Sequence, residues 1–140
     1  MFSDLEIILI EDSESDAEIV LRALKRAQIH VDVTHLDDGE LAFSFLDRIS
    51  SRKSPPVLIL LDLKMPKIDG HELIRRIKTN ERLRSIPLVV LSSSREDKDI
   101  RKAYELGINS YVVKTVDYET FSKLVVDTVN YWLRVNQPPV

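Results

Sequence analysis

Five short apolar runs alternate with five segments of helical periodicity, and this alternation limits the possible folds more than any other feature of the chain. Four of the runs are almost continuously apolar, which is typical of parallel strands buried on both faces. The run at 31–36 alternates apolar and polar residues, so we expect it at a sheet edge with one solvated face. The predicted strands span residues 7–10, 31–36, 57–61, 88–91 and 111–113.

The segments between these runs carry apolar residues at helical spacing. Ser15 and Glu18 predict a capping box at the start of the first helix, and Gly107 predicts the end of the fourth. Five successive strand–helix units predict an α/β fold, a doubly wound (βα)5 five-stranded parallel sheet with helices on both faces. At 140 residues we expect a single domain over residues 1–135 and a short tail over 136–140, where two prolines cannot continue a helix.

Composition excludes several classes of function. The net charge is −3 and the basic residues are scattered, which argues against nucleic acid as a partner. The chain has no cysteine, so disulfides, thiolate metal sites and cysteine nucleophiles are excluded. No apolar run reaches the roughly 20 residues that a membrane span needs, and the N-terminus does not resemble a signal peptide. We therefore expect a cytoplasmic protein with no membrane partner.

Acidic residues follow two of the predicted strands. Asp62 ends the apolar run 57–61, and Glu11 and Asp12 end the run 7–10. The carboxyl ends of parallel strands share one edge of the sheet, so these three carboxylates are expected in one crevice. They would repel one another without a cation, and hard oxygen ligands suit Mg²⁺. The alternative is that Glu11 and Asp12 only begin an acidic helix start that the helix dipole favours.

Two further polar residues follow the last two predicted strands. Lys114 follows the last run and could pair with Asp62 and with a bound phosphoryl group, although a surface lysine at a strand end is the more common case. Ser92 could donate to a phosphoryl oxygen or could cap the next helix. Taken together with the acidic residues, they predict phosphoryl transfer onto Asp62 with formation of an acyl phosphate.

As a set, these motifs resemble the response-regulator receiver domain of two-component signalling. The resemblance rests on four segments: Glu11-Asp12, Asp62 to Gly70 with its Lys64-Met65-Pro66, Ser92, and Tyr111 to Lys114. It implies a CheY-like fold with strand order 2-1-3-4-5. It also implies that a sensor histidine kinase donates the phosphoryl group and that the chain is not a turnover enzyme.

The resemblance also implies a role for each site residue. Asp62 would be the phosphorylation site, with Lys114 and Ser92 assisting the transfer. Asp12, Asp62 and the backbone carbonyl of Lys64 would hold Mg²⁺, and Glu11 would help through water. Ser92 and Tyr111 would form the switch pair, in which Ser92 moves toward the phosphoryl group and Tyr111 rotates inward.

One departure from the family concerns Thr115, which stands where receivers usually have a proline after a cis bond. A non-proline cis bond costs roughly 2.5–4 kcal/mol, so a trans bond and a differently shaped loop are open alternatives here, and the sequence does not decide the isomer. Thr115, the long connection at 50–56 and the Trp132-Leu133 ending resemble the stand-alone regulators that serve phytochrome histidine kinases. That likeness suggests a homodimer through the fourth and fifth helices. We expect the signal to pass to a downstream protein target by protein–protein contact.

Two other functions are compatible with parts of this sequence, and two related ones are not. A degenerate receiver that acts only as a protein-binding module and a small hydrolase of free phosphoesters remain alternatives. A flavodoxin is excluded because the acidic stretch 11–16 would repel the FMN phosphate. An aspartate-nucleophile phosphatase would need an acid where Lys64 stands.

His71 is expected to be a surface residue at a helix start.

Overall fold

The computed structural model describes residues 5–139, and its centre is a five-stranded parallel sheet. Its strand order, β2-β1-β3-β6-β7, is the 2-1-3-4-5 order of the predicted fold, which is thereby confirmed. The strands are β1 (Glu6–Ile10), β2 (Asp32–Leu36), β3 (Leu58–Leu61), β6 (Leu88–Ser92) and β7 (Ser110–Val113). The predicted domain, 1–135, and tail, 136–140, extend beyond the described residues at the two ends of the chain, and these limits stay a prediction.

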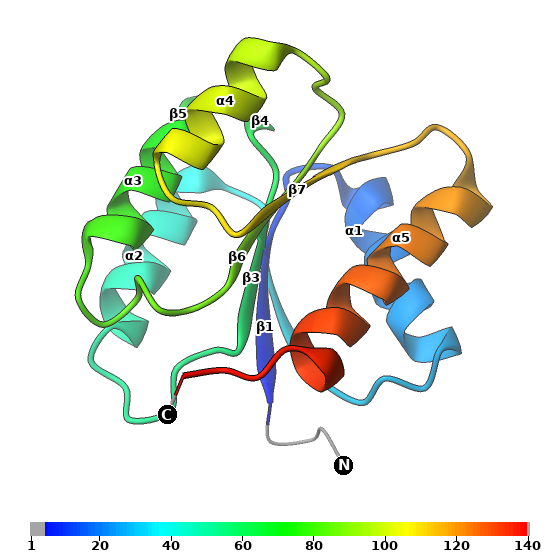
Figure 1. Cartoon of the computed structure of the whole chain (residues 1–140), viewed down its shortest axis with the longest axis horizontal. Helices are drawn as coiled ribbons and strands as arrows, with labels where there is room; N and C mark the ends of the chain where they lie inside the picture. The colour runs from blue at the N-terminus through cyan, green and yellow to red at the C-terminus, as the bar shows by residue number, and fades with distance from the viewer. Residues whose placement is uncertain (1–4, 140) are drawn as a thin grey trace.

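Helices cover both faces of the sheet, as Figure 1 shows, with α1 and α5 on one face and α2, α3 and α4 on the other. The helices are α1 (Glu14–Arg26), α2 (Gly39–Ile49), α3 (Gly70–Thr79), α4 (Asp97–Glu105) and α5 (Tyr118–Asn130), which continues as the π-helical turn η1 (Tyr131–Val135). Alternate residues of each central strand enter opposite cores. Ile7 and Leu9 pack toward α1 and α5, whereas Ile8 and Ile10 pack on the other face.

The outer strands are less buried than the central ones. β2 lies at one edge, and its residues are exposed or half-buried except Leu36, which confirms the expectation from its alternating pattern. β7 forms the other edge, and all of its residues are half-buried. The central strands β1, β3 and β6 are therefore the buried elements, and β1 and β3 are followed by the acidic residues.

Two helix ends test the predicted caps. The Ser15–Glu18 capping box is wrong, because α1 begins at Glu14 and Ser13 is its N-cap. The Ser13 hydroxyl accepts the backbone N–H of Asp16 at 3.2 Å. At the end of α4 the prediction is confirmed, because Gly107 follows the C-cap with φ of 107°, a conformation that favours glycine.

The connection after Asp62 contains an element that the sequence did not predict. β4 (Lys64–Met65) and β5 (Ile68–Asp69) form a small antiparallel hairpin between β3 and α3. After the carboxyl end of β7, the Lys114–Thr115 bond is trans, as are all peptide bonds among residues 5–139. No helix in the described part of the chain is long and apolar enough to span a membrane.

Candidate functional site

Three carboxylates meet at the carboxyl edge of the sheet. β1 and β3 are neighbours, with Ile10 opposite Leu61, so the residues that follow these strands are adjacent. One oxygen atom from each of Glu11, Asp12 and Asp62 lies within 4.8 Å of the other two. Glu11 and Asp62 are buried and Asp12 is half-buried. The structure therefore brings together the three acidic residues that the sequence placed in one crevice.

This group of oxygen atoms fits a hard divalent cation. The ligand atoms are carboxylate oxygens alone, which suits Mg²⁺ better than a softer transition metal. The backbone N–H of Lys64 donates to Asp62 Oδ1 at 3.2 Å, so the start of the hairpin is held against the site. The side chain of Lys64 is directed elsewhere and pairs with Asp99 at 3.1 Å.

Lys114 is the cation of the site. Its ammonium Nζ lies 2.6 Å from Glu11 Oε1, 2.8 Å from Asp16 Oδ2 and 3.3 Å from Asp62 Oδ2. The side chain is 9% exposed, so these charges interact with little solvent screening. The expected pairing with Asp62 is present, but the two shorter contacts are with Glu11 and with Asp16, which the sequence analysis did not single out.

The ionisation of the site follows from burial and from this pairing. Burial raises the pKa of Glu11 to about 8, although the hydrogen bond from Lys114 opposes the shift, and the charge of Asp62 adds to it. Burial alone would lower the pKa of Lys114, but its hydrogen bonds to Asp16 and Glu11 outweigh that effect and raise the pKa. The ammonium is therefore held in its charged form.

The raised pKa of Glu11 predicts how stability depends on pH. Between the ordinary value of 4.5 and about 8, the folded state binds more protons at Glu11 than the unfolded state does. The stabilisation is complete below the lower value and is lost as pH rises through the upper one. With a chelator present, urea denaturation between pH 5 and 8.5 is expected to show the free energy of unfolding falling with pH.

The variant that tests this assignment is Glu11→Gln, which cannot titrate and is expected to flatten the pH dependence. Glu14→Gln, at an exposed position in the first turn of α1, is the matched control and should retain the slope of the parent protein. If Glu11→Gln and the parent lose stability equally over this pH range, Glu11 does not have the raised pKa.

The two predicted switch residues both contact Ser94. Ser92 is fully buried at the end of β6, and its hydroxyl accepts the N–H of Ser94 at 3.2 Å. Tyr111 is half-buried on β7 and donates from its hydroxyl to the Ser94 carbonyl at 3.0 Å. Ser92 does not cap α4, whose N-cap is Glu96. The geometry links Ser92 and Tyr111 through one loop, while their role as a switch stays a prediction.

A buried polar cluster that the sequence analysis missed continues from this loop. The Ser94 hydroxyl donates to Asp99 Oδ2 at 2.6 Å, and the Asp99 carbonyl lies 3.1 Å from His71 Nε2. The Ser94 hydrogen bond lowers the pKa of Asp99, with burial opposing and Lys64 adding to the shift. His71 is 9% exposed, so its predicted surface position is wrong, because α4 packs its first turn over the imidazole ring.

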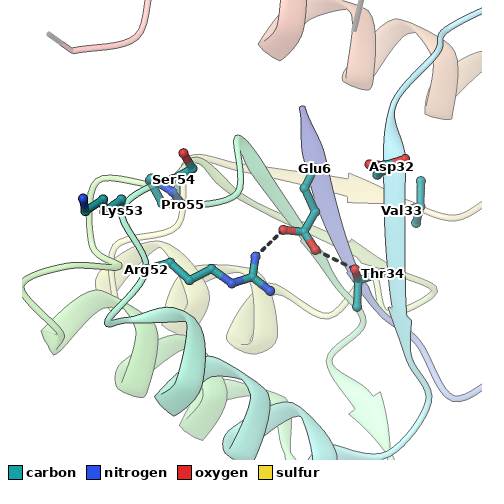
Figure 2. A pocket seen from close by; sticks show the side chains of 8 residues that line it. All are labelled: Glu6, Asp32, Val33, Thr34, Arg52, Lys53, Ser54 and Pro55. Atoms are coloured by element: carbon teal, nitrogen blue, oxygen red, sulfur yellow. Dashed lines mark hydrogen bonds and ion pairs between the residues drawn. The ribbon is translucent and has the colours of Figure 1, made fainter. Parts of the chain in front are cut away.

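A surface hollow lies at the other end of the sheet, as Figure 2 shows. The Arg52 guanidinium pairs with Glu6 at 2.7 Å, and Glu6 also accepts the Thr34 hydroxyl at 2.6 Å. These contacts fix the connection between α2 and β3 against the starts of β1 and β2. The hollow is thus separated from the acidic site by the length of the strands.

Comparisons with known proteins agree with this geometry. The family model of the response regulator receiver domain matches residues 7–126. The probable methanogenesis regulatory protein FilR2 of Methanothrix harundinacea is 40% identical over 134 residues, which cover 95% of this chain and 86% of the relative. Response regulator Rcp1 of Synechocystis is 40% identical over 129 residues, which cover 91% of this chain and 88% of the relative.

Solved structures extend the likeness to the fold. The Mn²⁺-bound form of Rcp1 superposes with a TM-score of 0.87 and 36% identity, covering 97% of this chain and 99% of that one. The phosphorylated cyanobacterial phytochrome response regulator RcpA gives a TM-score of 0.89 at 33% identity, with the same coverage. With the sheet order, the acidic group and the lysine paired with it, these matches show that the chain belongs to the response-regulator receiver domain family.

Proposed function

We propose that this receiver domain is a single-domain response regulator in which Asp62 accepts a phosphoryl group from the phosphohistidine of a sensor histidine kinase. The observation that carries the proposal is the position of Asp62. It lies among two further carboxylates and within 3.3 Å of the Lys114 ammonium. An Asp62 oxygen would form the bond to phosphorus while the P–N bond of the donor breaks, and the electron pair would leave on the imidazole nitrogen. A carboxylate nucleophile needs no general base to remove a proton.

The residues around Asp62 have separate roles in this proposal. Mg²⁺ held by Asp12, Asp62 and the Lys64 carbonyl, with Glu11 acting through water, would supply positive charge to the transferring group. Lys114 stabilises the equatorial phosphoryl oxygens with its ammonium. Support for such a site comes from the clustered carboxylates and from the Mn²⁺-bound form of Rcp1.

The output is proposed to be a change in protein–protein contacts rather than a reaction. Ser92 moves toward the new phosphoryl group, and Tyr111 rotates inward after the Ser94 contact is released. The affected surface lies around α4 and α5, where a homodimer would form. A phytochrome is the proposed kinase, because RcpA is a phytochrome response regulator. Phosphotransfer from a purified phytochrome kinase tests the proposed donor, separately from the ability of Asp62 to accept a phosphoryl group.

The experiment that tests the proposed function is labelling with acetyl phosphate and Mg²⁺. Intact mass is expected to rise by one phosphoryl group, through a bond that is stable in acid and labile in base. Asp62→Asn should abolish the increase, because the amide is not a nucleophile. Asp117→Asn is the matched control, since Asp117 is an exposed N-cap of α5 and asparagine also caps helices well.

Two outcomes would contradict the proposal. Repeated turnover of a chromogenic phosphate ester would indicate a hydrolytic enzyme instead. Unchanged signalling by Asp62→Asn would indicate a receiver that acts only as a protein-binding module.

A further inference from the structure

The lysine of the site is shared between the phosphoryl acceptor and a residue on a different layer of the fold. Lys114 Nζ lies closer to Asp16 Oδ2, at 2.8 Å, than to Asp62 Oδ2, at 3.3 Å. Asp16 belongs to the first turn of α1, and Lys114 follows β7, so the pair joins positions 98 residues apart. Asp16 is 31% exposed, whereas Lys114 is 9% exposed. Asp16 therefore approaches the ammonium from the solvent side of the site.

Both members of this pair are held in place by other contacts. The N–H of Asp16 donates to the hydroxyl of the N-cap Ser13, and α1 is anchored by Ala17 and Val20, which are buried. The N–H of Lys114 donates to the Ser92 carbonyl at 2.8 Å. Because each backbone position is fixed independently, the ion pair is preorganised and does not depend on two mobile surface side chains meeting.

The charges around Lys114 give Asp16 a specific effect. The ammonium already lies 2.6 Å from Glu11 Oε1, and without a further partner it would also compete with a divalent cation for the Asp62 oxygen atoms. Asp16 gives the ammonium a partner at 2.8 Å, nearer than Asp62, and offsets part of its charge. It also lies outside the group of three carboxylates that meets around the candidate metal position.

We propose that Asp16 is a positioning residue that holds Lys114 beside the phosphoryl acceptor while leaving the oxygen atoms of Asp62 available to Mg²⁺. The inference rests on the proposed function, which it extends to a residue outside the acidic group. Asp16 does not contact the phosphoryl group in this arrangement. Its effect reaches the reaction through Lys114 and through the affinity for the cation.

The test is a calorimetric titration of the unphosphorylated full chain with Mg²⁺ alone. Asp16→Asn keeps the shape of the side chain but removes its charge, and it is expected to raise the Mg²⁺ dissociation constant about three- to tenfold. In labelling with acetyl phosphate, the variant should be slow at low Mg²⁺ and within about twofold of the parent at saturating Mg²⁺ if the effect acts through cation affinity. If Asp16 only supported the structure, the labelling rate of the variant would not depend on the Mg²⁺ concentration in this way.

Two further variants separate the role of Asp16 from general charge and stability effects. Glu14→Gln removes the same charge from the same helical turn at an exposed position, and it should leave the Mg²⁺ affinity unchanged. In the Lys114→Gln background, most of the effect of Asp16→Asn should disappear, because the ammonium that it positions is absent. An effect of equal size in both backgrounds would overturn the proposed action through Lys114.

The remaining outcomes distinguish this inference from the proposed function. If the parent binds Mg²⁺ and Asp16→Asn binds it equally well, the role of Asp16 is wrong and the proposed function stands. If the parent protein binds no Mg²⁺, the proposed metal site is wrong, and the role of Asp16 is overturned with it.

Discussion

Replacing Lys114 by methionine is expected to lower the free energy of unfolding by about 3–5 kcal/mol at pH 8 in the presence of a chelator. The methionine keeps most of the apolar stem but removes the charge that lies 2.6 Å from Glu11 and 3.3 Å from Asp62. Both carboxylates are buried and the pKa of Glu11 is already raised to about 8, so the variant must either protonate Glu11 further or hold two unpaired negative charges with little screening. Urea denaturation of the parent and of the variant measures the difference directly.

Two comparisons show whether the loss comes from the buried charge. Lys123→Met removes a lysine that pairs with Asp127 at 2.9 Å, but both side chains are well exposed. Its expected cost is below about 1 kcal/mol. Adding Mg²⁺ should restore part of the stability of Lys114→Met, because a cation that binds only the folded state stabilises it. Equal losses for the two methionine variants would show that the buried ammonium has no special role.

The residues of the acidic site could be predicted because the positions and order of the strands are enough to place them. Apolar runs fix the central strands, and parallel pairing brings the residue after each strand to the same edge. Glu11, Asp12 and Asp62 follow neighbouring strands, and Lys114 follows the edge strand β7. Their proximity therefore follows from the order of elements along the chain, without knowledge of side-chain packing.

Asp16 could not be identified in the same way, because its position already has a sufficient local explanation. An acid in the first turn of a helix is favoured by the helix dipole, so nothing in the sequence indicates a distant partner. The contact with Lys114 depends on how α1 lies across the carboxyl ends of the strands, which is a tertiary property.

The sequence also did not predict the burial of Asp99 and His71 or the β4–β5 hairpin, because these features depend on tertiary contacts too. Asp99 lies in an acidic helix start that reads as solvated, yet the packing of α4 buries it against Ser94 and His71. The hairpin β4–β5 has strands of two residues each, too short for any periodic pattern to be recognised. These features arise where loops meet one another, and hydrophobic periodicity carries no information about such contacts.

The hairpin after Asp62 is held so closely that Gly70→Ala is expected to impair the site. A β-carbon at position 70 would lie 2.5 Å from the Leu63 Cα and 2.7 Å from its carbonyl oxygen. These are backbone atoms between Asp62 and Lys64, so they cannot give way without moving the site residues on either side. The expected cost in unfolding free energy is about 1–3 kcal/mol. The rate of labelling by acetyl phosphate should fall more than about tenfold, because small displacements of reacting groups are costly.

Gly107→Ala provides the contrast that assigns this loss to the site rather than to stability. Gly107 has φ of 107°, so alanine would strain the backbone there, but its nearest neighbour is the flexible Lys78 side chain at 3.5 Å. The expected cost is about 1–3 kcal/mol, with labelling of Asp62 unchanged once the protein is folded. If both alanine variants lose stability but are labelled as fast as the parent, the contact between Gly70 and Leu63 does not position Asp62. If only Gly70→Ala is labelled slowly, the close approach of these two backbone segments sets the geometry of the phosphoryl acceptor.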